Sequence, residues 1–175
     1  IILIAVIGIL LVLGIAVFFA YNNIANYNPE TATLSIKAGD VEIDRNSQGW
    51  FPATNGMKLI ASDKLKTGKA ASAIITFYES ITAEVDENSE VSVKVLGEKY
   101  SALKLEGGSV WSKFTKLSGV ESYEIQTPNA VAAVRGTEFG VDYKDGETWV
   151  ANAEGEVVME SDGDVKLVEK GKRMK

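Results

Sequence analysis

The residue types that most often carry out catalysis are scarce in this chain. It has no His and no Cys, and therefore lacks the usual general base, thiol nucleophiles and Cys-based metal sites. Ser and Lys without these partners give weak support for a nucleophile, and no spacing of carboxylates indicates a glycosidase pair. We therefore expect a protein that is not an enzyme, with no cofactor and no metal.

One segment has a spacing of oxygen ligands that could suggest calcium. Asp86, Asn88 and Glu90 alternate with Glu87 and Ser89. The segment lacks the glycine turn and the distal Glu of an EF-hand loop. We therefore expect a solvated turn and not a metal site.

Arg135 stands out because it is the only charged residue between Gln126 and Thr137. Its guanidinium offers five donors in a fixed fork, which suits it to join backbone carbonyls and a carboxylate. We expect a buried Arg135 that acts as such a structural tie, and the alternative is a contact with a ligand or partner. Pro128 should lie at a strand start or edge, and Gly136 should break the following strand.

The elements that position these residues are predicted to be strands. From residue 33 onward apolar and polar residues alternate, with turn signals about every ten residues. The pattern indicates an all-β domain over 33–175, a sandwich, a barrel or a solenoid-like roll. We expect 48–69 to pack over one end of the core, a turn at Gly107-Gly108, and core or interface positions for the three Trp residues. The expected strands are Thr33–Lys37, Asp40–Arg45, Ala71–Tyr78, Ile81–Asp86, Glu90–Leu96, Tyr100–Glu106, Ser109–Lys116, Ser122–Thr127, Val131–Val134, Glu138–Tyr143, Thr148–Ala153, Glu156–Glu160 and Val165–Glu169.

The N-terminal residues predict a single hydrophobic α-helix. Residues 1–21 are apolar or Gly apart from Tyr21, and no charge occurs before Glu30. A helix of 21 residues spans about 31 Å, close to the hydrocarbon thickness of a bilayer. We expect a transmembrane-type or filament-core helix over 1–27, ended near Pro29, and a connector over 28–32. Small residues would let a neighbouring helix approach closely, and with the first residue they define the expected assembly helix: Ile1, Gly8, Gly14, Ala16 and Ala20.

All charged residues of the chain lie beyond residue 29. The sequence has 18 basic and 24 acidic residues and a net charge of −6. Such an acidic domain argues against nucleic acid as a partner and against a polybasic contact with anionic lipid.

The stretch 123–141 is the most specific part of the sequence. Thr127-Pro128 is followed by small apolar residues, then by Val134-Arg135-Gly136-Thr137 and the aromatic Phe139. This order resembles the signature of the FecR domain family, and the resemblance covers Thr33–Gly171. It implies an all-β, solenoid-like extracytoplasmic domain that works by protein contacts and not by catalysis. Further pieces in the family's order are Gly39-Asp40-Val41, Gly49-Trp50, Leu59, Asp63–Gly68, Ala71-Ser72-Ala73, Phe77, Leu105–Gly108, Val110-Trp111 and Glu154–Val157.

The start of the chain at the hydrophobic segment resembles a mature type IV pilin-like subunit, whose leader is cut at that point. FecR-type signalling members usually carry an anti-sigma segment before the membrane helix, and none is visible here. We therefore expect a cell-surface, extracellular filament subunit that forms a homopolymer through its N-terminal helix and displays the β-domain outside. Its partners would be copies of itself, and the membrane before assembly. The alternative is a single-pass membrane-anchored sensor, signalling or envelope protein of the FecR type, with the β-domain outside the cytoplasm.

Overall fold

The computed structural model describes residue 14 and residues 31–97, 99–115 and 120–175. The predicted helix over 1–27 therefore lies outside the described residues apart from Gly14, as does most of the 28–32 connector. Within the described ranges, no helix is both long and apolar enough to cross a bilayer. The strands are β1 Ala32–Ala38, β2 Val41–Asp44, β3 Trp50–Pro52, β4 Lys58–Leu59, β5 Lys64–Thr67, β6 Ser72–Phe77, β7 Ile81–Val85, β8 Glu90–Leu96, β9 Tyr100–Phe114, β10 Ser122–Gln126, β11 Val131–Val134, β12 Glu138–Lys144, β13 Glu147–Glu154, β14 Val157–Ser161, β15 Asp164–Val168 and β16 Arg173–Met174.

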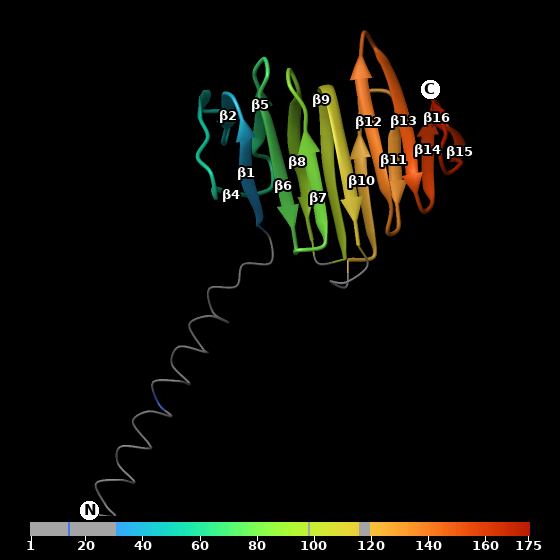
Figure 1. Cartoon of the computed structure of the whole chain (residues 1–175), viewed down its shortest axis with the longest axis horizontal. Coiled ribbons are helices and arrows are strands. Elements are labelled where there is room, and N and C mark those ends of the chain that lie inside the picture. Colours follow the sequence, from blue (N-terminus) through green and yellow to red (C-terminus); the bar gives the residue numbers. More distant parts are fainter. Residues whose placement is uncertain (1–13, 15–30, 98, 116–119) are drawn as a thin grey trace, which may run out of the picture.

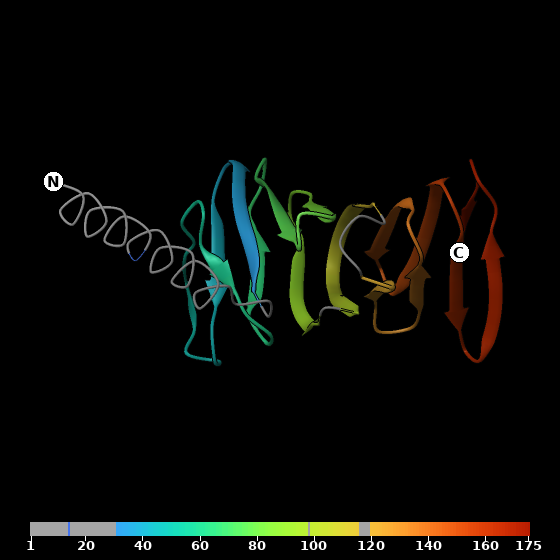
Figure 2. The ribbon, with the colours of Figure 1, turned by 90° about the horizontal axis from the view of Figure 1, so that it is seen from below.

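The strands form two layers that share β9 (Figure 1). We call the layer β4-β1-β6-β7-β9-β12-β13-β16 sheet 1 and the layer β3-β2-β5-β8-β9-β10-β11-β14-β15 sheet 2. Neighbouring strands are antiparallel except β9 and β10, which are parallel. The chain alternates between the layers in short groups of strands as it advances from one end of the domain to the other (Figure 2). The predicted all-β domain is confirmed, and its form is a two-layered, solenoid-like roll.

Strand β9 is continuous where a turn was expected. Its first half pairs with β8 as far as Gly107, and its second half pairs with β7 and β12 from Gly108 onward. Gly108 has a φ of 93°, and a Cβ at this position would overlap Ser89. The turn predicted at Gly107-Gly108 was wrong because two glycines can also mark a bend that carries one strand into another sheet.

The core lies between the layers and follows the period-two pattern of the sequence. In β7, for example, Ile81, Ala83 and Val85 are buried while the residues between them are exposed. An aromatic cluster lies at its centre, in which the Tyr123 ring is 6.0 Å from both Phe77 and Phe139.

The stretch 48–69 contributes strands to both layers at the N-terminal end of the domain. It contains β3 and β4, each paired with one strand, and all of β5. An ion pair holds it to the end of β2: Arg45 Nε donates to Asp63 Oδ1 at 2.9 Å, and Arg45 Nη2 to Asp63 Oδ2 at 2.6 Å. Arg45 also donates to the Lys58 carbonyl, and the Ile60 amide donates to Asp63. Segment 48–69 therefore has its own buried anchor, because the Asp63 side chain is only 2% exposed.

Candidate functional site at the signature turns

The predicted signature residues lie at the two ends of β11. The Thr127-Pro128 pair is in the turn that enters this strand, and Arg135-Gly136-Thr137 is in the connection that leaves it for β12. The structure brings the second group together in one place and leaves the first group at the opposite end of the strand.

The entering turn is held by buried hydroxyl groups. The Thr127 hydroxyl accepts a hydrogen bond from the Ala130 amide at 3.0 Å. It also lies 2.7 Å from the Thr148 hydroxyl of β13. Pro128 is exposed in this turn, just before β11. Thr127 therefore has a structural role in joining the two layers.

Arg135 does not have the role predicted for it. Its side chain is exposed, and it makes no hydrogen bond or ion pair with any residue that the structure describes. The alternation of β11 explains this, since Ala132 and Val134 face the core and the next residue points outward. The buried tie expected at Arg135 was wrong, and an interaction of that kind occurs instead between Arg45 and Asp63.

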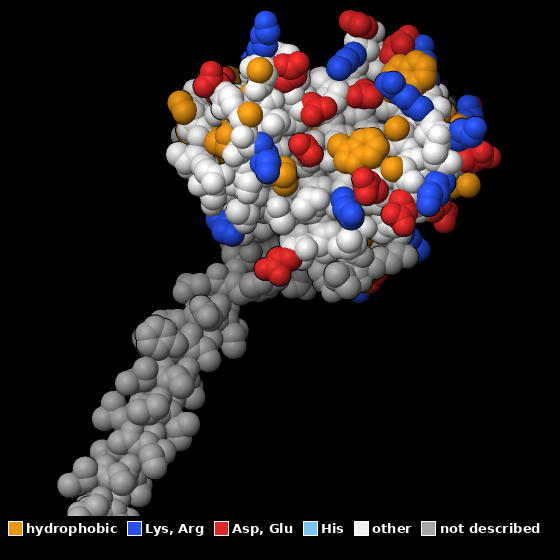
Figure 3. Space-filling view, in the orientation of Figure 1, with side chains coloured by type: hydrophobic (Ala, Val, Ile, Leu, Met, Phe, Trp, Pro, Cys, Tyr) orange, Lys and Arg blue, Asp and Glu red, His pale blue; other side chains and the backbone are white. Residues whose placement is uncertain are grey.

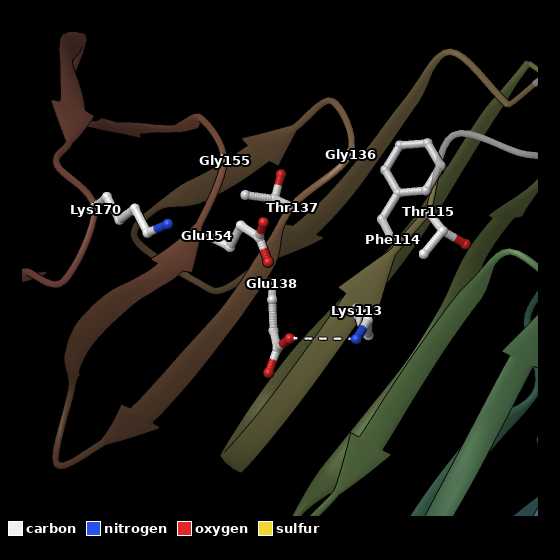
Figure 4. Close-up of a pocket in the computed structure, with 9 residues that line it drawn as sticks. All are labelled: Lys113, Phe114, Thr115, Gly136, Thr137, Glu138, Glu154, Gly155 and Lys170. Carbon is white, nitrogen blue, oxygen red and sulfur yellow. Dashed lines mark ion pairs between the residues drawn. The ribbon is translucent and has the colours of Figure 1, made fainter.

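A cleft of about 630 Å³ opens beside the connection that follows Arg135 (Figure 4). We call it the signature cleft. Strand β9 supplies one wall, the β11–β12 connection supplies the middle, and the β13–β14 turn supplies the other wall, with one lysine from the segment after β15. Its lining residues are Lys113, Phe114, Thr115, Gly136, Thr137, Glu138, Glu154, Gly155 and Lys170.

Close packing of two turns shapes this cleft. A Cβ at Gly155 would lie 2.7 Å from the carbonyl oxygen of Gly136 and 3.0 Å from the Thr137 methyl group, so only glycine allows this approach. The buried Thr137 hydroxyl donates to the Glu156 carbonyl at 3.3 Å. Phe139, the next inward-facing residue, is fully buried in the aromatic cluster. The signature thus fixes the two turns relative to the core.

The cleft offers charged groups of both signs. Lys113 Nζ lies 3.6 Å from Glu138 Oε2 (Figure 4), and Glu154 and Lys170 line the other side. Ion pairs at such solvent-exposed positions contribute little to stability and exchange readily with a partner's charges. The described ranges contain no cluster of three or more potential metal-ligating side chains. The arrangement is therefore suited to polar contacts with another protein.

Sequence reasoning missed several lining residues. Lys113, Thr115 and Lys170 lie in segments without a distinctive motif, and lysine is common on any surface. Glu154-Gly155 gave a detectable signal, since Glu154–Val157 is one of the stretches that follow the family's order.

The oxygen-rich segment 86–90 forms a turn pinned to the chain around Gly68. The Glu87 carboxylate accepts a hydrogen bond from the Ala70 amide. Ser89 is buried, and its hydroxyl accepts a hydrogen bond from the Ser109 amide at 2.9 Å. Two of the five side chains are thus committed to protein contacts.

Comparisons with known proteins identify the family. The FecR protein family matches residues 63–158, more than half of the chain, and this chain belongs to that family. No curated protein matches it. Two crystal structures of a candidate anti-sigma factor from Parabacteroides distasonis, at 2.50 and 1.65 Å resolution, are similar in fold, each with a TM-score of 0.55 and 12% identity. The similarity covers 63% of this chain and 52% of theirs, so the chain spans about half their length.

These findings correct the predicted function. The prediction of a pilin-like filament subunit was wrong. So was the prediction that the chain forms a homopolymer with copies of itself as partners. The family match identifies a FecR protein, and the two crystal structures share its fold. The family match therefore favours the alternative, a FecR-type protein.

Proposed function

We propose that this chain is a membrane-anchored sensor or signalling protein of the FecR type that acts through protein contacts outside the cytoplasm. The family match over residues 63–158 supports this proposal. The observation that carries it is Arg135, a charged residue of the signature that the described part of the fold leaves exposed and unpaired.

The other signature residues are used by the fold. Thr127 and Thr137 are buried and hydrogen-bonded, and Phe139 is buried in the core. A guanidinium binds a carboxylate through two parallel hydrogen bonds, which gives both strength and orientation. Arg135, next to the polar signature cleft, is therefore suited to bind an acidic group of a protein partner.

The predicted helix over 1–27 would supply the anchor. Its residues are uncharged throughout, and a helix of this length can span a bilayer. The acidic β-domain would then extend from the membrane and carry Arg135 to its partner.

The test is transcriptional complementation in the native host. We expect deletion of the gene to change the expression of a defined set of genes, and the wild-type chain to restore it. Arg135→Ala should fail to restore it although its amount in the membrane is normal. Lys37→Ala is the matched control, because Lys37 is also an exposed cation, and it should restore expression fully. Unchanged transcription after deletion, or full restoration by Arg135→Ala, would contradict the proposal.

A further inference from the structure

Two tryptophans lie on the outer face of sheet 1. Trp111 is on β9 and Trp149 is on β13, with β12 between these strands. This face carries isolated hydrophobic side chains among acidic and basic ones (Figure 3). The two indoles have similar charged neighbours, and they differ in whether an arginine packs on the ring.

At the Trp149 site, an arginine of the same chain packs on the ring. Arg173 Cζ lies 4.8 Å from the centre of the Trp149 ring, within the range of a cation–π interaction. The same guanidinium donates to Asp142 Oδ2 at 2.8 Å, and Asp142 is the direct cross-strand neighbour of Trp149. Glu147, two residues before Trp149 on β13, pairs with Lys175, which lowers the pKa of its carboxyl group.

The Trp111 site has the same parts without the arginine. Its direct cross-strand neighbour is Glu84 on β7, which is exposed. The Trp111 indole N–H donates to Glu138 Oε1 at 3.2 Å, and Glu138 is paired with Lys113. Each indole therefore has a lysine-paired glutamate and a cross-strand carboxylate. Among the described residues, only the Trp149 site has an arginine on its ring.

The Trp111 ring is held in a fixed position. Trp111 pairs with Gly140 on β12, and the indole lies directly over this glycine, where any Cβ would overlap the ring. One face of the indole therefore packs on the backbone. The Trp111 side chain is nevertheless 38% exposed, although β9 is a central strand with neighbours on both sides. A rigid aromatic surface of this kind loses little conformational entropy on binding.

We propose that Trp111 and Glu84 bind an arginine side chain presented by a protein partner. Arginine fits better than lysine because its planar guanidinium can stack on the indole while its N–H groups reach a carboxylate at the side. The net charge of −6 favours a basic partner. The chemistry is the one that Arg173 already shows on the same face. This inference does not depend on Arg135, although Glu138 and Lys113 beside Trp111 also line the signature cleft.

The test uses the whole chain in detergent micelles with ¹⁵N-labelled indoles, whose three signals belong to Trp50, Trp111 and Trp149. The probes are three capped peptides that differ only at the central position, which is arginine, lysine or citrulline. We expect the arginine peptide to shift the Trp111 signal, the lysine peptide to bind several-fold more weakly, and the neutral citrulline peptide to leave the signal unchanged. Glu84→Gln, an exposed and conservative change, should weaken binding of the arginine peptide about tenfold.

Arg173→Ala provides an internal standard. It removes the arginine from Trp149, so the Trp149 signal of this variant should begin to respond to the arginine peptide as Trp111 does. A Trp111 signal that stays silent while Trp149 responds in this variant would overturn the proposal. So would an equal response to the citrulline peptide, or unchanged binding in Glu84→Gln.

Discussion

Two arginines of the domain, Arg45 and Arg135, differ in the contacts that the fold gives them. Arg45 donates through Nε and Nη2 to Asp63, and its Nη2 also donates to the Lys58 carbonyl. Arg135 lies in a connection between strands, is exposed, and has no such contact with the described residues. The fold uses the first guanidinium to hold an irregular segment in place and leaves the second one available to a partner.

The comparison shows what decides whether an arginine is buried. An isolated charge in an apolar stretch suggested that Arg135 faced the core, but strand alternation turns this residue outward. Arg45 is held because Asp63, 18 residues further along, is only 2% exposed and needs a countercharge. The buried acceptor, and not the apolar surroundings in sequence, determines the position of the donor.

The largest effect is expected for Phe139→Ala, four positions beyond Arg135 in the same signature. Phe139 is fully buried and its ring centre lies 6.0 Å from that of Tyr123. Truncation leaves a cavity in the core, which should lower the free energy of unfolding by about 3–5 kcal/mol. Urea unfolding of the chain in micelles, followed by circular dichroism, measures this loss. A change below that of Arg45→Met would contradict the assignment of Phe139 to the core.

A loss of about 2–3 kcal/mol is expected for Arg45→Met, since it leaves Asp63 buried without a countercharge. The value is at the lower end for a buried pair because the Arg45 side chain is 34% exposed and solvent screens part of its charge. The same urea titration measures it.

The double variant Arg45→Met/Asp63→Leu is the control for that loss. Replacing both charges by apolar groups removes the stranded carboxylate and should recover most of the stability, although the Ile60 amide then loses its acceptor. A double variant less stable than Arg45→Met would show that the contacts of Asp63 with other groups matter more than the ion pair.

Most of the all-β architecture was predictable because period-two alternation is a direct consequence of strands with one buried face. The strands over Ile81–Asp86 and Glu138–Tyr143 were expected within a residue or two of their observed bounds. The bend of β9 at Gly108 was not, because it depends on the approach of Ser89 from the turn before β8. Such long-range packing leaves no local pattern.

The candidate site was predictable only through its glycine-containing turns. Gly136 and the Glu154-Gly155 turn were recognised, but their mutual contact depends on how β11 to β14 fold back on each other. The same holds for Trp111 and Glu84, which are 27 residues apart and become direct neighbours through the pairing of β7 with β9.

A smaller effect is expected at alkaline pH, and it comes from Tyr100 on the central strand β9. Burial, and next a hydrogen bond from the hydroxyl to Glu124, raise the pKa of Tyr100 from 10.0 to about 12. The folded state thus keeps a proton that the unfolded chain loses, so this contribution is complete below pH 10.0 and disappears as the pH rises through about 12. The Asp63 hydrogen bond raises the pKa of Arg45, so that tie persists over the same interval.

Tyr100→Phe measures the alkaline effect of this one residue. The stability difference between wild type and Tyr100→Phe should shrink by about 1 kcal/mol between neutral pH and the upper end of that interval, because the half-buried phenol is partly screened by solvent. Urea titrations at several pH values give the difference directly. A constant difference across the interval would show that the Tyr100 phenol is not the titrating group.

The smallest effect on stability is expected for Arg135→Met, and it is the strictest test of the comparison. The side chain is exposed and makes no hydrogen bond or ion pair with the described residues, so the free energy of unfolding should change by about 0.5 kcal/mol or less. Arg45→Met is the matched variant, with the same chemical change at a guanidinium that the fold uses. If Arg135→Met proved as destabilising as Arg45→Met, Arg135 would be a structural tie after all, and it could not be the residue left for a partner. A stable Arg135→Met protein that fails to restore transcription would separate folding from function at this single position.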